Sequence, residues 1–159
     1  MLSRGDAVVY KCRGVYRVEE VGKLDFSFVD GKKDYYTLQS IDNQRDKAYV
    51  PIDDDKNIRR PVSEQKAKEL LDHLAEVGIL NVKNEKYREQ EYKDCISSLC
   101  PENWVKVLKT LYSRTKRRGS MTSMDKKYQL LLEHALSSEM NYVLGIPAGE
   151  MTELIKKSE

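Results

Sequence analysis

The stretch Pro101–Lys127, PENWVKVLKTLYSRTKRRGSMTSMDKK, joins an amphipathic helix pattern to a local concentration of positive charge. Trp104, Val107, Leu108 and Leu111 recur at the spacing of one helix face, which predicts a helix buried along that side. Between Asn103 and Tyr128 there is one acid, Asp125, and there are eight bases: Lys106, Lys109, Arg114, Lys116, Arg117, Arg118, Lys126 and Lys127. The whole chain has a net charge of only +2, so this positive charge is a local feature.

The same stretch contains the signals of a helix end and a helix start. Gly119 suits the residue after a helix, and Arg117 and Arg118 would lie in the last turn, where cations favour the helix dipole. Ser123 is a good N-cap for a second helix. We expect a helical hairpin with a basic corner, which is either a solvated helix end or a phosphate-binding surface.

Composition places the chain among charge-rich globular proteins. Its 159 residues are 40% hydrophobic and 34% charged, enough for one domain or two small ones. No apolar run is long enough for a membrane span. The N-terminus lacks the apolar segment of a signal peptide, so we expect a mature cytoplasmic protein.

Catalytic and metal-binding signatures are weak. Cys12, Cys95 and Cys100 are too few and too scattered for a disulfide framework or a zinc site. Residues 53–55 are three consecutive aspartates, which favour a solvated turn over a metal site. No nucleophile, phosphate-loop or metalloprotease motif is present. We therefore expect a protein that is not an enzyme and needs no cofactor or metal.

The first third of the chain has the pattern of short strands without intervening helices. Alternation of Leu24, Phe26 and Phe28 with polar residues predicts a strand before a hairpin turn at Asp30-Gly31. The five expected strands lie at about 7–10, 15–18, 24–28, 35–38 and 47–50. Such spacing favours a small twisted barrel or a strongly curved sheet. Residues 53–60 are expected to be a charged connector.

From Ser63 onward the period becomes helical. We expect a helix from Ser63 towards Gly78, a second from about Asn84 to Pro101, and then the basic helix. A fourth, long helix would end at Gly145, with a short helix near the C-terminus. The fold class is therefore α+β: a small β domain, 1–60, followed by an all-helical domain, 61–159, of about four to five helices.

Three aromatic features leave alternatives open. Tyr87 next to Arg88 suits either stacking on a base or packing on a neighbouring helix. Trp104 shares the apolar helix face, which favours a core position. The hydrophobic margin of the sheet, from Val21 to Phe28, suits either pairing with a partner's strand or a capped edge.

Taken in order, these motifs resemble the CarD/CdnL family of bacterial transcription regulators that bind RNA polymerase. The resemblance is carried by Gly5–Tyr10, Arg13–Val15, Gly31 with Tyr35–Tyr36, Val50–Asp53, Ile58–Val62, Arg117–Gly119 and Asp125–Lys127. It implies a Tudor-like N-terminal domain that pairs with the RNA polymerase β subunit. It also implies a helical domain that contacts promoter DNA at the upstream edge of the transcription bubble and stabilises the open complex.

Several site residues follow only from this resemblance. The polymerase-binding positions are Val21, Leu24, Phe26, Ser27, Phe28 and Tyr49, and the family often has Arg where Leu24 and Tyr49 stand. The DNA-facing lysine falls on Lys126. The family's wedge tryptophan falls on Arg88, next to Tyr87, and Trp104 is not its equivalent.

Together the charge pattern and the resemblance predict a regulator tethered to RNA polymerase. The expected DNA-binding residues are Tyr87, Arg88, Lys106, Lys109, Arg114, Lys116, Arg117, Arg118, Lys126 and Lys127. The expected partners are the RNA polymerase β subunit and promoter DNA, bound by a nucleoid-associated monomer and without a membrane. The alternatives are a polymerase-binding adaptor without a DNA role and a stand-alone, non-specific nucleic-acid-binding protein.

Overall fold

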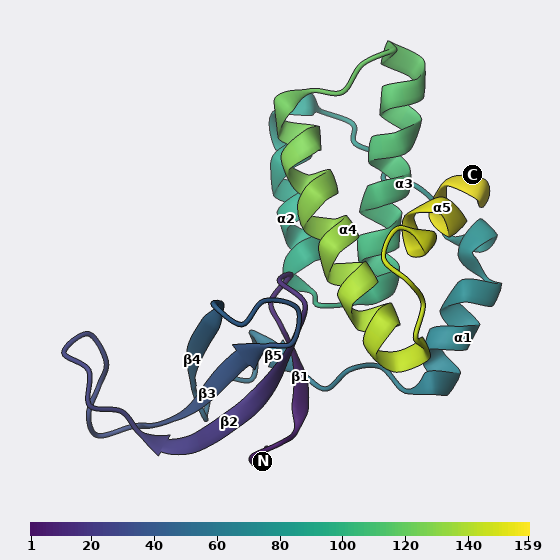
Figure 1. Ribbon diagram of the computed structural model, residues 1–159. Coiled ribbons are helices and arrows are strands. Elements are labelled where there is room, and N and C mark those ends of the chain that lie inside the picture. Colours follow the sequence, from purple (N-terminus) through teal and green to yellow (C-terminus); the bar gives the residue numbers. More distant parts are fainter.

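The computed structural model describes residues 1–159 as a five-stranded antiparallel sheet followed by five α-helices (Figure 1). The strands are β1 (Ala7–Tyr10), β2 (Val15–Lys23), β3 (Asp34–Ser40), β4 (Lys47–Pro51) and β5 (Ile58–Arg59). Their order across the sheet is β4-β3-β2-β1-β5. The predicted α+β fold class is confirmed.

Alternation along β1 divides the buried residues of the sheet between two cores. Val8 belongs to the core of the sheet, with Tyr16 and Leu38. Its neighbour Val9 belongs to the helical core. Because successive strand residues point to opposite faces, β1 is buried on both sides, and the helices cover one face of the sheet.

One predicted strand is wrong and one strand was missed. Residues 24–33 form the loop between β2 and β3, and the Phe26/Phe28 alternation does not belong to a strand. The expected connector instead contains β5, which pairs with β1 through Val9–Arg59 and Tyr10–Ile58. Alternation is a local signal, and in this loop the two Phe side chains stack on each other instead of entering the core.

The helical part contains α1 (Glu64–Asp72), α2 (Arg88–Ser97), α3 (Pro101–Arg118), α4 (Ser123–Leu144) and α5 (Glu150–Lys157). Two short 3₁₀ turns, η1 (Leu74–Glu76) and η2 (Glu85–Tyr87), lie between α1 and α2. The first helix is thus shorter than expected and ends before Gly78. No helix combines the length and the apolar character needed to cross a membrane.

The helix caps explain where α3 and α4 meet. Gly119 has a φ of 78°, a left-handed conformation that only glycine adopts readily, and it ends α3 as predicted. Thr122, not Ser123, is the N-cap of α4, because its side-chain oxygen accepts a hydrogen bond from the Asp125 N–H. Trp104 is fully buried in the helical core, which confirms its predicted place.

The sheet and the helices are joined by a buried ion pair. The Arg59 guanidinium donates two hydrogen bonds of 2.7 Å to the Glu139 carboxylate, and the Val62 N–H donates a third of 2.9 Å. Glu139 is fully buried. Arg59 also donates to the Leu99 carbonyl and lies 5.5 Å from the Trp104 ring. A bidentate pair of this kind fixes both distance and orientation.

A second contact lies between the β1–β2 turn and α4. The Val15 N–H donates to Ser138 Oγ, and Ser138 donates to Asp42. A Cβ added at Gly14 would lie 2.8 Å from Ser138 Oγ, and Gly14 also has a φ of 111°. This turn therefore requires glycine both for its backbone conformation and for the close approach of α4.

Candidate nucleic-acid and protein interfaces

Three aromatic side chains lie together on the surface of the sheet domain. Phe26 stacks on Phe28 with ring centroids 5.2 Å apart, and it meets Tyr49 of β4 edge-on at 5.1 Å. Phe28 is 75% exposed and Phe26 is 39% exposed. We call these three residues the aromatic cluster. Because large apolar side chains are seldom left grouped in water, it is a candidate protein-binding surface.

The edge of the sheet beside this cluster is β4, which carries the predicted residue Tyr49, whereas Leu24–Phe28 of the predicted margin lie in the loop after β2. β4 is outermost in the sheet and pairs only with β3. β2 pairs with β3 along its length and with β1 only in its first half, so Val21 lies where the far side of β2 has no strand partner. Val21 and Tyr49 thus both lie on open strand edges, an arrangement that follows from strand order and not from periodicity.

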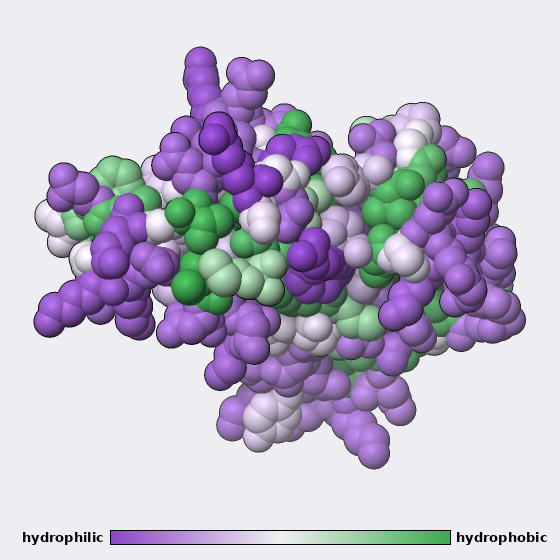
Figure 2. Space-filling view, turned by 90° about the horizontal axis from the view of Figure 1, so that it is seen from below, coloured by the Kyte–Doolittle hydropathy of each residue, from purple (hydrophilic) through white to green (hydrophobic).

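The other predicted polymerase-binding residues lie close in sequence to the aromatic cluster. Leu24 is half-buried and Ser27 is exposed, both in the loop after β2. On the face seen in Figure 2, hydrophobic residues form separate patches among mostly hydrophilic side chains.

The predicted basic corner exists at the meeting point of α3 and α4. Arg117 and Arg118 are exposed in the last turn of α3, and Lys126 and Lys127 are exposed at the start of α4. We call these four residues the basic tip. It lies at the end of the helical domain away from the sheet (Figure 1).

Two of the other predicted cations are not part of the tip: one lies in the same turn of α3 but pairs with an acid, and the other lies farther along the helix. Lys116 is exposed but pairs with Glu159 beyond α5, with 3.6 Å between the charged atoms. Lys106 is half-buried near the start of α3, about 17 Å from the tip at the helical rise per residue.

Lys109, Arg88 and Arg114 are buried, so their prediction as DNA-binding surface residues is wrong. The Lys109 ammonium donates to the carbonyls of Leu74 and Val77 at 2.7 and 2.8 Å, so it ties α3 to η1. Burial lowers its pKa. Charged groups that leave water need such partners.

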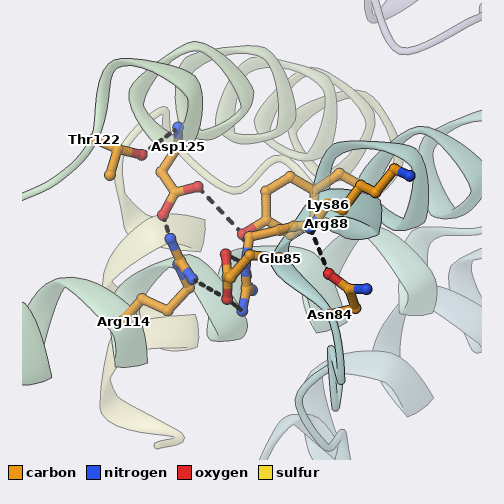
Figure 3. A network of polar contacts seen from close by, with 8 residues as sticks. Asn84, Glu85, Lys86, Arg88, Arg114, Thr122 and Asp125 are labelled. Atoms are coloured by element: carbon orange, nitrogen blue, oxygen red, sulfur yellow. Dashed lines mark hydrogen bonds and ion pairs between the residues drawn. The ribbon is translucent and has the colours of Figure 1, made fainter.

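Arg88 and Arg114 belong to a network with two acids (Figure 3). Arg88 donates to both oxygens of Glu85, at 2.7 and 2.6 Å. Arg114 donates to Asp125 at 2.9 Å and to Glu85 at 3.5 Å. Chiefly through the Arg88 hydrogen bonds, the pKa of Glu85 is lowered to about 2. The network ties η2 and α3 to the start of α4, and so it supports the basic tip.

Tyr87 is 55% exposed beside this network, and the Lys86 ammonium lies 5.7 Å from its ring. Its ring does not pack in the core, so it is available for stacking. Sequence reasoning missed the acids that neutralise the buried arginines. The three-residue spacing of Glu85 and Arg88 was a usable signal, because helical side chains three apart are neighbours.

Comparison with known protein families bears on the sheet domain. Residues 2–62 match the model of the CarD-like/TRCF RID domain. No curated protein matches the chain. The match confirms the resemblance for the N-terminal domain and indicates RNA polymerase as its partner.

Proposed function

Starting from an N-terminal domain of the CarD-like/TRCF RID type, we propose that the chain is a non-catalytic transcription regulator tethered to RNA polymerase. In this proposal the sheet domain docks on the polymerase β subunit. The basic tip then contacts promoter DNA near the edge of the transcription bubble and modulates open-complex stability. The protein acts as a cytoplasmic monomer.

The domain match carries the proposal, and the aromatic cluster beside the open β4 edge supports it. A strand added to β4 would gain backbone hydrogen bonds, and the neighbouring rings would bury its side chains. Pairing through the backbone does not need the arginines that the family often has at the positions of Leu24 and Tyr49.

A pull-down with the isolated β subunit tests the docking step. We expect Phe26→Ser with Phe28→Ser to abolish capture, because aromatic anchors carry much of the free energy of binding. Leu130→Ser is the matched control, since Leu130 is 57% exposed on α4. If the β subunit captures the double Phe variant as efficiently as the wild type, the aromatic cluster is not the docking surface.

Tethering supports a DNA role for a small basic surface. A weak contact becomes effective when docking raises the local concentration of DNA at the tip. The tip offers four phosphate contacts, from Arg117, Arg118, Lys126 and Lys127. If all four form, log K for DNA binding falls with the logarithm of the salt concentration at a slope of about −3.6. The slope is measured with the free protein and a short duplex.

The matched control for the tip is Lys156→Ala with Lys157→Ala, because both lysines are exposed on α5. That variant should keep the wild-type slope, whereas Arg117→Ala with Arg118→Ala should make it shallower by about 1.8. A salt-independent affinity for DNA would contradict the phosphate contacts.

The burial of Arg88, Lys109 and Arg114 favours one rival, a polymerase-binding adaptor without a DNA role. The open-complex lifetime on one promoter separates the two functions. If the protein is a DNA-contacting regulator, substitution of the basic tip should remove its effect on the open-complex lifetime. If it is an adaptor without a DNA role, the same variant should still bind polymerase and should change the open-complex lifetime as much as the wild type does.

A further inference from the structure

A cavity of about 440 Å³ lies between η2, α3 and the segment 79–82. Four arginines line it: Arg88, Arg114, Arg117 and Arg118. Glu85 is the only acid of the lining, and Asn81 and Thr110 add neutral polar groups. Glu85 and the buried Asp125, which pairs with Arg114 behind the lining, offset the charges of Arg88 and Arg114. The excess positive charge is therefore that of Arg117 and Arg118.

Glu85 occupies the position between the two buried guanidinium groups (Figure 3). It accepts from Arg88 at 2.6 and 2.7 Å and from Arg114 at 3.5 Å. Its side chain is 69% exposed, whereas those of Arg88 and Arg114 are only 8% and 9% exposed. The guanidinium groups of Arg88 and Arg114 are thus fixed by packing, whereas the carboxylate of Glu85 lies on a single 3₁₀ turn at the surface.

This geometry is suited to an anion with more oxygens than a carboxylate. Planar guanidinium groups bind phosphate through paired N–H donors, and such bonds are among the strongest in proteins. Arg88 and Arg114 keep N–H groups beyond those that Glu85, Tyr92 and Asp125 accept. Arg117 and Arg118 add exposed donors at the rim.

We propose that this cavity binds the phosphoryl group of a small phosphorylated solute, and that Glu85 is an internal anion which the ligand displaces. A small solute fits better than DNA, because a duplex surface reaches the rim arginines but not the two buried ones. The proposal goes beyond the proposed function and does not depend on it. Since Arg117 and Arg118 also belong to the basic tip, a bound solute would weaken DNA binding there.

Calorimetric titration of the full chain with inorganic pyrophosphate at low salt tests the site. We expect one saturable site, which Glu85→Gln strengthens roughly tenfold by removing the competing charge. Glu91→Gln is the matched control: it removes a half-buried acid from the first turn of α2, which follows η2 directly, and Glu91 does not line the cavity. That variant should leave the affinity unchanged.

A second pair of variants keeps the test informative if Glu85→Gln perturbs folding. Arg117→Ala with Arg118→Ala should weaken pyrophosphate binding roughly tenfold or more. Lys126→Ala with Lys127→Ala removes the same charge from residues that do not line the cavity, so it should have little effect. If the two double variants lose the same amount of affinity for pyrophosphate, binding depends only on overall positive charge, and the proposal is overturned.

Two further results would also overturn it. The first is the absence of pyrophosphate binding to both the wild type and Glu85→Gln. The second is a Glu85→Gln variant that binds duplex DNA more tightly while neither protein binds pyrophosphate, which would assign the phosphoryl group to DNA. Because the titration contains neither polymerase nor DNA, its failure would leave the proposed function standing.

Discussion

At the scale of single residues, Glu139 is the side chain on which the arrangement of the two domains depends. It is fully buried and accepts two hydrogen bonds from Arg59 and one from the Val62 N–H. Removing one partner of a buried ion pair costs about 3–5 kcal/mol, because the other charge stays desolvated. We expect Arg59→Met to lower the melting temperature by roughly 10 °C, measured by calorimetry.

The neighbouring Arg60 provides the control for that measurement. Its guanidinium is largely exposed and lies 3.5 Å from Asp6. An exposed pair contributes at most about 1 kcal/mol, so Arg60→Met should change the melting temperature little. Equal shifts for the two variants would show that Arg59 has no special role at the junction.

Glu85 gives a residue-scale prediction with a defined pH range. Its pKa falls from an ordinary 4.5 to about 2 in the folded protein, chiefly through hydrogen bonds from Arg88. Its contribution to stability is therefore present above about pH 5 and is lost as the pH falls towards 2. We expect the protection factors of the amides in η2 and early α2, corrected for the intrinsic pH dependence of exchange, to fall over this range.

Glu85→Gln is the control for that exchange measurement. It cannot titrate, so it should remove the pH dependence of these protection factors and give lower protection at all pH values. An unchanged pH profile in the variant would assign the effect to another carboxylate.

At the scale of elements, the turn between α3 and α4 places the basic tip. Gly119 has a φ of 78°, and a residue with a Cβ is disfavoured there by about 1–2 kcal/mol. Gly119→Ala should therefore lower the urea midpoint of unfolding. Gly78→Ala is the control, because Gly78 does not have a left-handed φ and an added Cβ would meet nothing within 4 Å.

The helical elements were predictable because their signals are local. The spacing of Trp104, Val107, Leu108 and Leu111 identified the buried face of α3, and Gly119 identified its end. The Phe26 and Phe28 alternation was equally local but misleading. Its partner ring, Tyr49, lies on β4, and nothing in the local pattern reveals that contact.

The candidate site was predictable as a concentration of charge but not in its detail. Lys109 is buried because η1, more than thirty residues earlier in the chain, presents carbonyls to it. Arg114 is buried because the turn at Gly119 returns Asp125 to it. Such pairings depend on tertiary structure, so composition did not separate structural arginines from exposed ones.

At the scale of the whole molecule, the two candidate surfaces lie on the sheet and on the far end of the helices, and the Arg59–Glu139 pair, the Ser138 contacts and the packing of Val9 in the helical core form the junction between these parts. The basic tip is about 18 Å along α4 from Ser138 and Glu139, which contact the sheet domain. If the sheet domain is docked on polymerase, the junction determines where the tip can meet DNA. A rigid junction raises the effective concentration of the tip at that place.

This coupling gives a prediction that neither domain gives alone. Glu139→Gln, studied below its melting temperature, should keep wild-type capture by the β subunit and wild-type affinity of the free protein for duplex DNA. It should nevertheless reduce the effect of the protein on open-complex lifetime, because a loosened junction spreads the tip over many positions. A variant that keeps the full effect would show that the Arg59–Glu139 pair is not needed to orient the tip.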